Sequence, residues 1–284
     1  MLKLIECPRD AMQGIETFIP SKIKASYINQ LLKVGFDTID FGSFVSPKAI
    51  PQMRDTAEVL SQLELDPQGS KLLAIVANRR GAETALQFDE IQYLGYPLSI
   101  SETFQQRNTN RGIQDSLVLV EEMQALCQAR GKELVVYISM AFGNPYQDPY
   151  SPEIAEEFAE KLFGLGLRII SLADTTGEAS QASIQRLFET LIPRFPEVSF
   201  GAHFHATPDE ARLKIQAAYE AGCQRFDGAL LGFGGCPMAK DDLVGNIATE
   251  QMIAYFKEKE IELRIDQDAF DRAKQAAQKV FQAH

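Results

Sequence analysis

The sequence is poor in cysteine and histidine. Its 284 residues include four cysteines and three histidines, and Cys7, Cys127, Cys223 and Cys236 are widely scattered. No pair of cysteines has the spacing of a zinc knuckle or a redox dithiol, so both kinds of site are excluded and we expect free thiols in a reducing cytoplasm. One histidine is the terminal His284, which leaves His203 and His205 as the candidates for chemistry.

Long apolar runs and basic charge are also scarce. No run approaches the roughly 18 residues that a membrane span needs, and the chain starts directly with a predicted strand, so we expect a cytoplasmic protein with no membrane partner. Lysine and arginine number 28 against 39 acidic residues, a formal charge of −11. Such a chain repels polyanions, which excludes nucleic acid as a general partner.

An anionic small molecule would therefore need a few local basic groups. Lys48, Arg54, Arg79 and Arg80 are the candidates, and a solvated basic face is the alternative for each of them.

Hydrophobic periodicity predicts the fold. Short runs rich in β-branched residues alternate with helical patterns, an order typical of parallel strands joined by crossover helices. Four glycines, Gly35, Gly131, Gly166 and Gly222, fall between a helix and the next strand, where a left-handed C-cap is expected. The predicted strands are residues 3–7, 38–43, 72–77, 90–94, 134–141, 168–173, 199–205 and 225–230.

Eight such units predict an α/β protein with the (β/α)₈ TIM-barrel fold, a single catalytic domain over residues 1–284 with an additional C-terminal helix at about 266–282. An open, doubly wound sheet is the alternative. It would usually carry a glycine-rich fingerprint after the first strand, and residues 6–10 (Glu-Cys-Pro-Arg-Asp) contain none.

Polar residues gather where the predicted strands end, which is where barrels of this type place their chemistry. His203 and His205 are two apart on a strand and can face the same side, so they can present two ring nitrogens to one ion. Asp10 could complete the set for a divalent cation such as Mg²⁺ or Mn²⁺, and Asn246 could add an amide oxygen. Core histidines, a capping aspartate and a turn asparagine are the structural alternatives.

Arg9 and Cys236 are each open to two interpretations. Arg9 could form a plain ion pair with an acid, or its guanidinium could stabilise an enolate oxygen in a closed site. Cys236 could be a small buried hydrophobic residue. Alternatively, because it comes directly after a glycine-rich segment, its thiol could lie on a mobile loop and serve as a proton donor or acceptor.

Four segments together resemble 3-hydroxy-3-methylglutaryl-CoA lyases, in matching order across nearly the whole chain. The Arg-Asp-x-x-Gln and His-x-His pieces are shared with a wider superfamily of metal-dependent barrels, whereas the Ser-Phe-Val-Ser-Pro-Lys segment and the Gly-Gly-Cys-Pro loop point to the lyase branch. The segments are residues 7–13 (Cys-Pro-Arg-Asp-Ala-Met-Gln), 43–53 (Ser-Phe-Val-Ser-Pro-Lys-Ala-Ile-Pro-Gln-Met), 203–205 (His-Phe-His) and 232–237 (Gly-Phe-Gly-Gly-Cys-Pro).

The resemblance implies cleavage of 3-hydroxy-3-methylglutaryl-CoA to acetoacetate and acetyl-CoA, a step of leucine degradation. It implies an acyl-CoA substrate, a divalent metal held by Asp10, His203, His205 and Asn246, and a possible homodimer. Arg9 would neutralise the developing enolate, and Cys236, with Asp40 or Asp174, would take part in proton transfer. The implied substrate-binding residues are Gln13, Ser43, Lys48 and Asn78.

The chain departs from the family pattern at four places. Asp40 replaces a glutamate, Ala206 replaces an acid or amide after His-x-His, Ala11-Met12 replaces Gly-Leu, and Met238 replaces a tyrosine. These changes keep three alternatives open: a lyase acting on a related hydroxyacyl-CoA, a condensing synthase that joins acetyl-CoA to a 2-oxo acid, and a barrel without catalytic activity.

Overall fold

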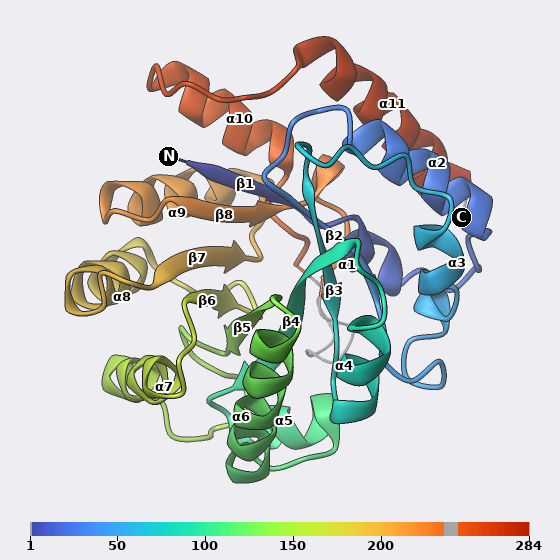
Figure 1. Cartoon of the computed structure of the whole chain (residues 1–284). Coiled ribbons are helices and arrows are strands. Elements are labelled where there is room, and N and C mark those ends of the chain that lie inside the picture. Colours follow the sequence, from blue (N-terminus) through green and yellow to red (C-terminus); the bar gives the residue numbers. More distant parts are fainter. Residues whose placement is uncertain (1, 236–243, 284) are drawn as a thin grey trace.

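The computed structural model describes residues 2–235 and 244–283. At its centre, eight parallel strands follow one another in chain order around a closed barrel, in which β1 also pairs with β8 (Figure 1). This arrangement confirms the predicted (β/α)₈ fold. The strands are β1 (Lys3–Glu6), β2 (Thr38–Ser43), β3 (Lys71–Ile75), β4 (Ile91–Ser99), β5 (Glu133–Ser139), β6 (Ile169–Asp174), β7 (Ser199–Phe204) and β8 (Arg225–Gly228).

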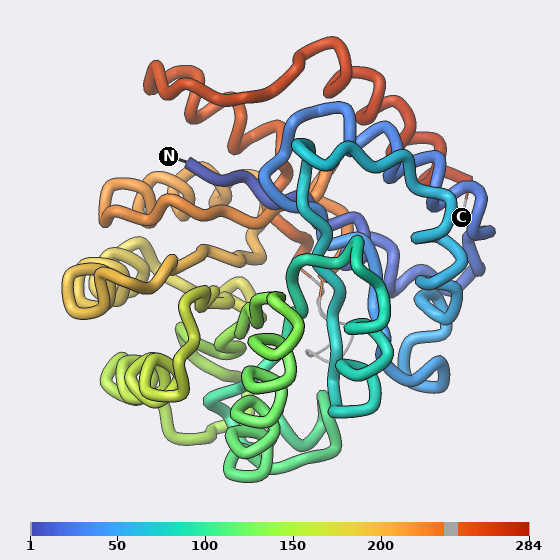
Figure 2. Tube along the Cα trace, in the orientation of Figure 1, coloured from blue at the N-terminus to red at the C-terminus, as the bar shows by residue number. Residues whose placement is uncertain are grey.

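Helices surround the barrel, and the tube in Figure 2 follows the chain from strand to helix around it. The α-helices are α1 (Pro8–Gln13), α2 (Ser21–Leu31), α3 (Thr56–Leu60), α4 (Arg79–Ala85), α5 (Glu102–Thr109), α6 (Ile113–Ala129), α7 (Pro152–Gly164), α8 (Gln181–Arg194), α9 (Pro208–Glu220), α10 (Thr249–Glu258) and α11 (Gln267–Ala283). Two 3₁₀ turns, η1 (Pro51–Met53) and η2 (Leu230–Gly232), complete the described elements.

The additional C-terminal helix is α11, which packs against α2 on the outside of the barrel (Figure 1). The carboxylate of Asp266 accepts a hydrogen bond from the backbone N–H of Ala269 at 2.8 Å, which caps the start of the helix. The predicted helix at about 266–282 is therefore confirmed.

The four glycines predicted as left-handed caps all have positive φ: 95° at Gly35, 64° at Gly131, 88° at Gly166 and 96° at Gly222. Glycine reaches such angles without the steric cost that a Cβ atom brings. Gly131, Gly166 and Gly222 directly follow the last capping residues of α6, α7 and α9, as the sequence predicts, whereas Gly35 lies four residues after the end of α2.

The prediction that the fourth strand ends at Leu94 was wrong, because β4 continues to Ser99. Gly95 and Pro97, residues that strands usually avoid, lie in this extension. A Cβ atom at Gly95 would lie 2.5 Å from Cδ1 of Ile75, so this glycine allows β3 and β4 to pack closely.

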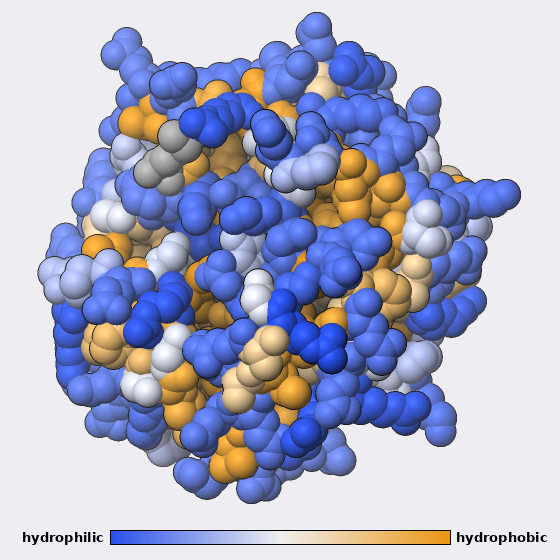
Figure 3. All heavy atoms as spheres, viewed as in Figure 1, coloured by the Kyte–Doolittle hydropathy of each residue, from blue (hydrophilic) through white to orange (hydrophobic). Residues whose placement is uncertain are grey.

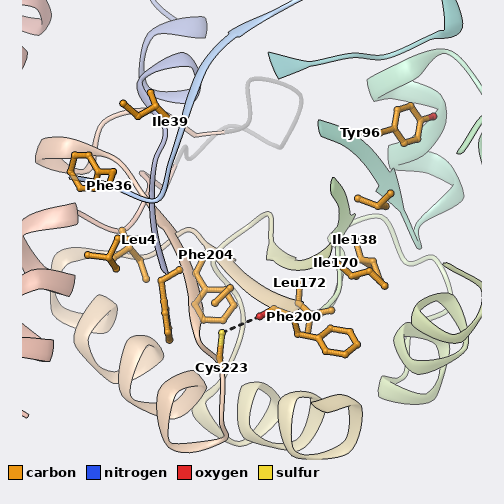
Figure 4. Close-up of a cluster of buried hydrophobic side chains, with 14 of the residues drawn as sticks. Leu4, Phe36, Ile39, Tyr96, Ile138, Ile170, Leu172, Phe200, Phe204 and Cys223 are labelled. Carbon is orange, nitrogen blue, oxygen red and sulfur yellow. Dashed lines mark hydrogen bonds between the residues drawn. The ribbon is translucent and has the colours of Figure 1, made fainter. Parts of the chain in front are cut away.

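The main hydrophobic core lies between the barrel and its helices, and Figure 4 shows part of it around Leu4, Phe200 and Phe204. A smaller cluster includes Leu73, Tyr93, Val135, Tyr137 and Ile169. The face of the molecule seen in Figure 3 is mostly hydrophilic, with scattered hydrophobic patches. Among residues 2–235 and 244–283, no helix is long and apolar enough to cross a membrane.

Candidate active site

A pocket opens where the C-terminal ends of the strands meet, as the barrel fold predicts. Its polar floor comes from α1 and from the end of β7, and its apolar wall comes from β3, β4, α5 and the loop before η1. The lining residues are Arg9, Asp10, Gln13, Ile50, Ile75, Pro97, Phe104, Asn108, Tyr137, Ser139, Ala173, Thr175, His203 and His205.

Asp10, His203 and His205 meet in this pocket. One ligand atom from each of the three side chains lies within 4.8 Å of the other two. Asp10 reaches this position from the first turn of α1, which begins at Pro8 directly after β1, and the two histidines come from the end of β7. The structure therefore brings together the carboxylate and the two imidazoles that the sequence singles out as metal ligands.

Asn246 lies beside this cluster. Its amide nitrogen donates to Oδ2 of Asp10 at 2.6 Å and to the backbone carbonyl of Phe233 at 2.9 Å. With this orientation the amide faces Asp10 with its donor, so a role as a metal ligand would require the amide oxygen to turn toward the ion.

His203 has a buried partner that sequence analysis missed. Its Nδ1 lies 3.1 Å from Oδ2 of Asp227, an acid on β8 whose side chain is fully buried. Burial opposes protonation of His203, but the hydrogen bond and the charge of Asp227 outweigh it and raise the pKa of the ring. The contact fixes the orientation of the imidazole and leaves Nε2 for another ligand.

His205 is held differently. Its Nδ1 is buried and has no hydrogen-bond partner within the described part of the chain. Burial, with the neighbouring charge of His203, lowers the pKa of His205 to about 4. The ring is therefore neutral at physiological pH and able to bind a cation.

Arg9 is the centre of a buried polar network. Its Nε donates to both carboxylate oxygens of Asp40, at 3.2 and 3.0 Å, and its Nη1 donates to Asp10 at 2.8 Å and to Gln13 at 3.0 Å. Gln13 in turn donates to Asp10 at 2.7 Å. Arg9 thus forms the ion pair with an acid, and its guanidinium also lines the pocket.

The two carboxylates next to Arg9 have opposite pKa shifts. Burial raises the pKa of Asp40 to about 6, although Arg9 opposes the shift. Burial acts on Asp10 too, but Arg9 and the two histidines outweigh it and lower the pKa of that carboxyl. Asp10 is accordingly ionised, as a metal ligand must be.

Asp174 does not line the pocket, although its neighbours Ala173 and Thr175 do. Alternation along β6 turns the Asp174 side chain to the opposite face. There its carboxylate accepts from Nζ of Lys214 at 2.7 Å and from the backbone N–H of Ala179 at 3.2 Å. The expectation that Asp174 transfers protons in the reaction is therefore not supported by its position.

A second pocket lies between the segments that follow β2 and β3. Ser43 and Asn78 line it together with the exposed basic residues Arg54 and Arg80. Lys48 is exposed and lines neither pocket. The hydroxyl of Ser43 donates to the carbonyl of Ile75, and Asn78 caps α4, so both also have structural roles.

Cys236 and Met238 lie outside the described residues. The chain that leads to them runs directly over the site, because a Cβ atom at Gly234 would lie 2.6 Å from Nδ2 of Asn246 and 2.7 Å from the carbonyl oxygen of Asp10. Gly234 has a φ of 97°, so both the space and the backbone angle require glycine at this position.

Sequence analysis also missed Tyr137, whose ring lies against His203 with the ring centres 5.4 Å apart. For Asp227 a signal was present. Two charged residues, Arg225 and Asp227, alternate on an otherwise apolar strand, and such residues point to the same side. In a closed barrel a buried charge of this kind needs a partner, which here is His203.

The donor set fits a divalent cation. One ionised carboxylate, two imidazoles and a nearby amide suit first-row metals and magnesium, and His205 has no competing side-chain hydrogen bond in the described residues. His203 also has the carboxylate partner that metal-bound histidines usually have.

Comparison with known proteins agrees with this geometry. The family model described as HMGL-like matches residues 3–276. The chain belongs to this HMGL-like family. A hydroxymethylglutaryl-CoA lyase of Bacillus subtilis, YngG, is 33% identical over 91% of this chain and 85% of its own length.

Two further proteins similar to this HMGL-like chain have names that state a substrate or a bound molecule. The 3-hydroxy-3-isohexenylglutaryl-CoA/hydroxy-methylglutaryl-CoA lyase of Pseudomonas aeruginosa is 34% identical over 94% of this chain and 89% of its own. The structure of an HMG-CoA lyase from Acinetobacter baumannii in complex with coenzyme A and 3-methylmalate superposes with a TM-score of 0.91 at 32% identity, covering 99% of this chain and 92% of that one.

Proposed function

We propose that this protein is a metal-dependent carbon–carbon lyase that cleaves 3-hydroxy-3-methylglutaryl-CoA to acetoacetate and acetyl-CoA. The observation that carries the proposal is the cluster of Asp10, His203 and His205 beside the Arg9 guanidinium, in one pocket of an HMGL-like barrel. We infer further that the whole chain forms one catalytic domain.

Asp10, His203 and His205 would hold the ion, with Asn246 as a fourth ligand, and the mixed oxygen and nitrogen donors favour Mg²⁺ or Mn²⁺. When bound, such an ion polarises the tertiary hydroxyl of the substrate and orients its oxygens.

Bond cleavage requires that the hydroxyl lose its proton and that the electrons of the breaking carbon–carbon bond pass to the acetyl-CoA fragment. The positive charge of Arg9 would stabilise the enolate that forms there, and Asp40 and Gln13 would hold the guanidinium in place. A proton then returns to the carbon of the enolate. Cys236 and Asp40 are our candidates for these proton transfers.

The second pocket is our candidate for the coenzyme A portion of the substrate. Arg54 and Arg80 would attract its phosphates, and Ser43 and Asn78 line the same pocket. This assignment gives the acidic chain the local basic groups that an anionic substrate requires.

A related, larger hydroxyacyl-CoA is the second candidate substrate. The Pseudomonas relative is named for a 3-isohexenyl as well as a 3-methyl substrate, and Ile50, Ile75, Pro97 and Phe104 give the pocket an apolar wall. Met12, in contrast, is fully buried and does not line the pocket, so its bulk does not select the acyl group directly.

The test is to incubate the purified protein and Mn²⁺ with a panel of hydroxyacyl-CoA thioesters and to measure acetyl-CoA release. We expect release from 3-hydroxy-3-methylglutaryl-CoA. Release only from analogues with longer 3-substituents would favour the second candidate. Consumption of acetyl-CoA with a 2-oxo acid would indicate a synthase, and metal binding with no turnover of any thioester would indicate a non-catalytic barrel.

Cys236→Ala tests the assignment of the thiol. We expect turnover to fall at least tenfold with Mn²⁺ affinity unchanged, because the thiol moves protons and is not among the proposed ligands. Turnover equal to that of the unmodified protein would remove Cys236 from the mechanism.

A further inference from the structure

Lys214 is a buried lysine that points from the outer helix α9 toward the C-terminal ends of β6 and β7. Its side chain is 4% exposed. Its Nζ donates three hydrogen bonds: to Oδ2 of Asp174 at 2.7 Å, to the carbonyl of Gly177 at 2.7 Å and to the carbonyl of His205 at 3.0 Å. An ammonium group has three donors, so each one has an acceptor here.

These acceptors join the ends of two neighbouring strands. Asp174 is the last residue of β6, Gly177 lies in the loop after it, and His205 directly follows β7. The backbone N–H of His205 also donates to the carbonyl of Asp174 at 3.2 Å. Lys214 therefore adds a second link between the main chain of His205 and β6.

The two histidines of the cluster differ in how they are held. Asp227 orients the ring of His203, whereas Nδ1 of His205 has no hydrogen-bond partner among the described residues. The next side chain, Ala206, has no polar atom that could help. The position of the His205 ring thus depends on how firmly its main chain is anchored.

We propose that Lys214 is a positioning residue, which holds the main chain of His205 so that its imidazole meets Asp10 and His203 around one metal ion. This inference rests on the proposed function for the existence of the metal site. It assigns the orienting role for His205 to a lysine on α9, the helix that follows β7, nine residues further along the chain.

The test is Mn²⁺ binding by the full-length protein, measured by titration calorimetry with the metal alone. We expect Lys214→Met to weaken Mn²⁺ binding about 10- to 100-fold, the usual cost of removing a group that orients a ligand. Affinity equal to that of the unmodified protein would overturn the proposal, and so would a failure of the unmodified protein to bind Mn²⁺.

Lys24→Met is the matched control. Lys24 is also a buried lysine, 3% exposed, that binds a carboxylate and a main-chain carbonyl, in this case Asp55 and Gln52. It lies away from the metal cluster, on α2. We expect a comparable loss of thermal stability with unchanged Mn²⁺ affinity, and an equal loss of affinity in both variants would overturn the specific role of Lys214.

The double variant Asp174→Asn/Lys214→Met covers the case in which the single variant does not fold. It removes both buried charges but still lacks the link to the His205 carbonyl, so we expect weak Mn²⁺ binding. Native affinity would show that only charge balance matters and would overturn the proposal. Because Mn²⁺ binding is measured without substrate, failure of the proposed lyase activity would appear separately, as tight binding without turnover.

Discussion

At the scale of single residues, the most informative contact is the one between His203 and Asp227. It joins β7 to β8 inside the barrel, where the Asp227 side chain is fully buried and the His203 side chain is 12% exposed. A carboxylate partner fixes the ring and increases the basicity of a metal-binding imidazole.

Replacing Asp227 should therefore lower the metal affinity, although Asp227 is not one of the proposed ligands. We expect Asp227→Asn to lower Mn²⁺ affinity about 10-fold and Asp227→Ala about 100-fold, because asparagine keeps a hydrogen bond and alanine keeps none. Calorimetric titration of the two variants measures this order. Equal, native affinities would show that Asp227 is not coupled to the site.

Glu6 leads to a pH prediction. This buried acid accepts from the backbone N–H of Leu230 at 2.8 Å and from the hydroxyl of Thr249 at 2.6 Å. Burial raises its pKa from 4.5 to about 8 despite these bonds. The folded protein therefore keeps the proton to higher pH than the unfolded chain does.

The contribution of Glu6 to stability is fully present below pH 4.5 and is lost as the pH rises toward about 8. Its share of the slope is at most about 1.4 kcal/mol per pH unit. We expect Glu6→Gln to flatten the dependence of the unfolding free energy on pH in this window, as measured by urea denaturation at several pH values. An unchanged slope would contradict the assignment.

At the scale of elements, the glycines at the helix ends show how local signals and packing combine. Gly35, in the turn between α2 and β2, and Gly131, directly after the cap of α6, both have positive φ. A Cβ atom at Gly131 would meet nothing within 4 Å, whereas one at Gly35 would lie 2.2 Å from the carbonyl oxygen of Arg264, in the segment that leads to α11.

Substitution by alanine should separate these two causes. Gly131→Ala should cost roughly 1–2 kcal/mol of unfolding free energy, because only the left-handed backbone is strained. Gly35→Ala should cost clearly more, since the backbone of the segment before α11 must also shift. Denaturant unfolding of the two variants measures the difference, and equal losses would show that the contact with Arg264 does not constrain the fold.

The elements could largely be predicted from the sequence because their signals are local. Strands such as β2 and helix ends such as Gly222 follow from patterns within a few residues. The end of β4 could not be predicted in this way, because Gly95 and Pro97 are locally unfavourable in a strand, whereas the pairing with β3 and β5 extends through them. A contact between strands outweighs the local propensity in that case.

At the scale of the whole molecule, the candidate site also combines features that local sequence patterns predict with contacts that form only in the folded chain. The His-x-His pair was visible because two residues on one strand share a side. Asp227 and Lys214 were missed as partners because the contacts that place them, to His203 and to His205, form only when the barrel closes and α9 packs on it. Asp174 was misplaced for the same reason, since only the folded chain shows which face of β6 it occupies.

The described pockets of this acidic molecule contain basic side chains. The chain carries a formal charge of −11, yet Arg54 and Arg80 both line the second pocket and Arg9 lines the first. An anionic substrate is therefore attracted by local groups against the overall charge, which predicts that binding weakens with rising salt.

The central claim is that Asp10, His203 and His205 hold a divalent cation on which cleavage of 3-hydroxy-3-methylglutaryl-CoA depends. The most direct test measures acetoacetate and acetyl-CoA from this substrate after metal removal by a chelator and again after addition of Mn²⁺ or Mg²⁺, with Asp10→Ala and the unmodified protein side by side. We predict equimolar products from the unmodified protein only when metal is restored, and at least a 100-fold loss of turnover in Asp10→Ala. Full activity of the chelated protein or of Asp10→Ala would contradict the account.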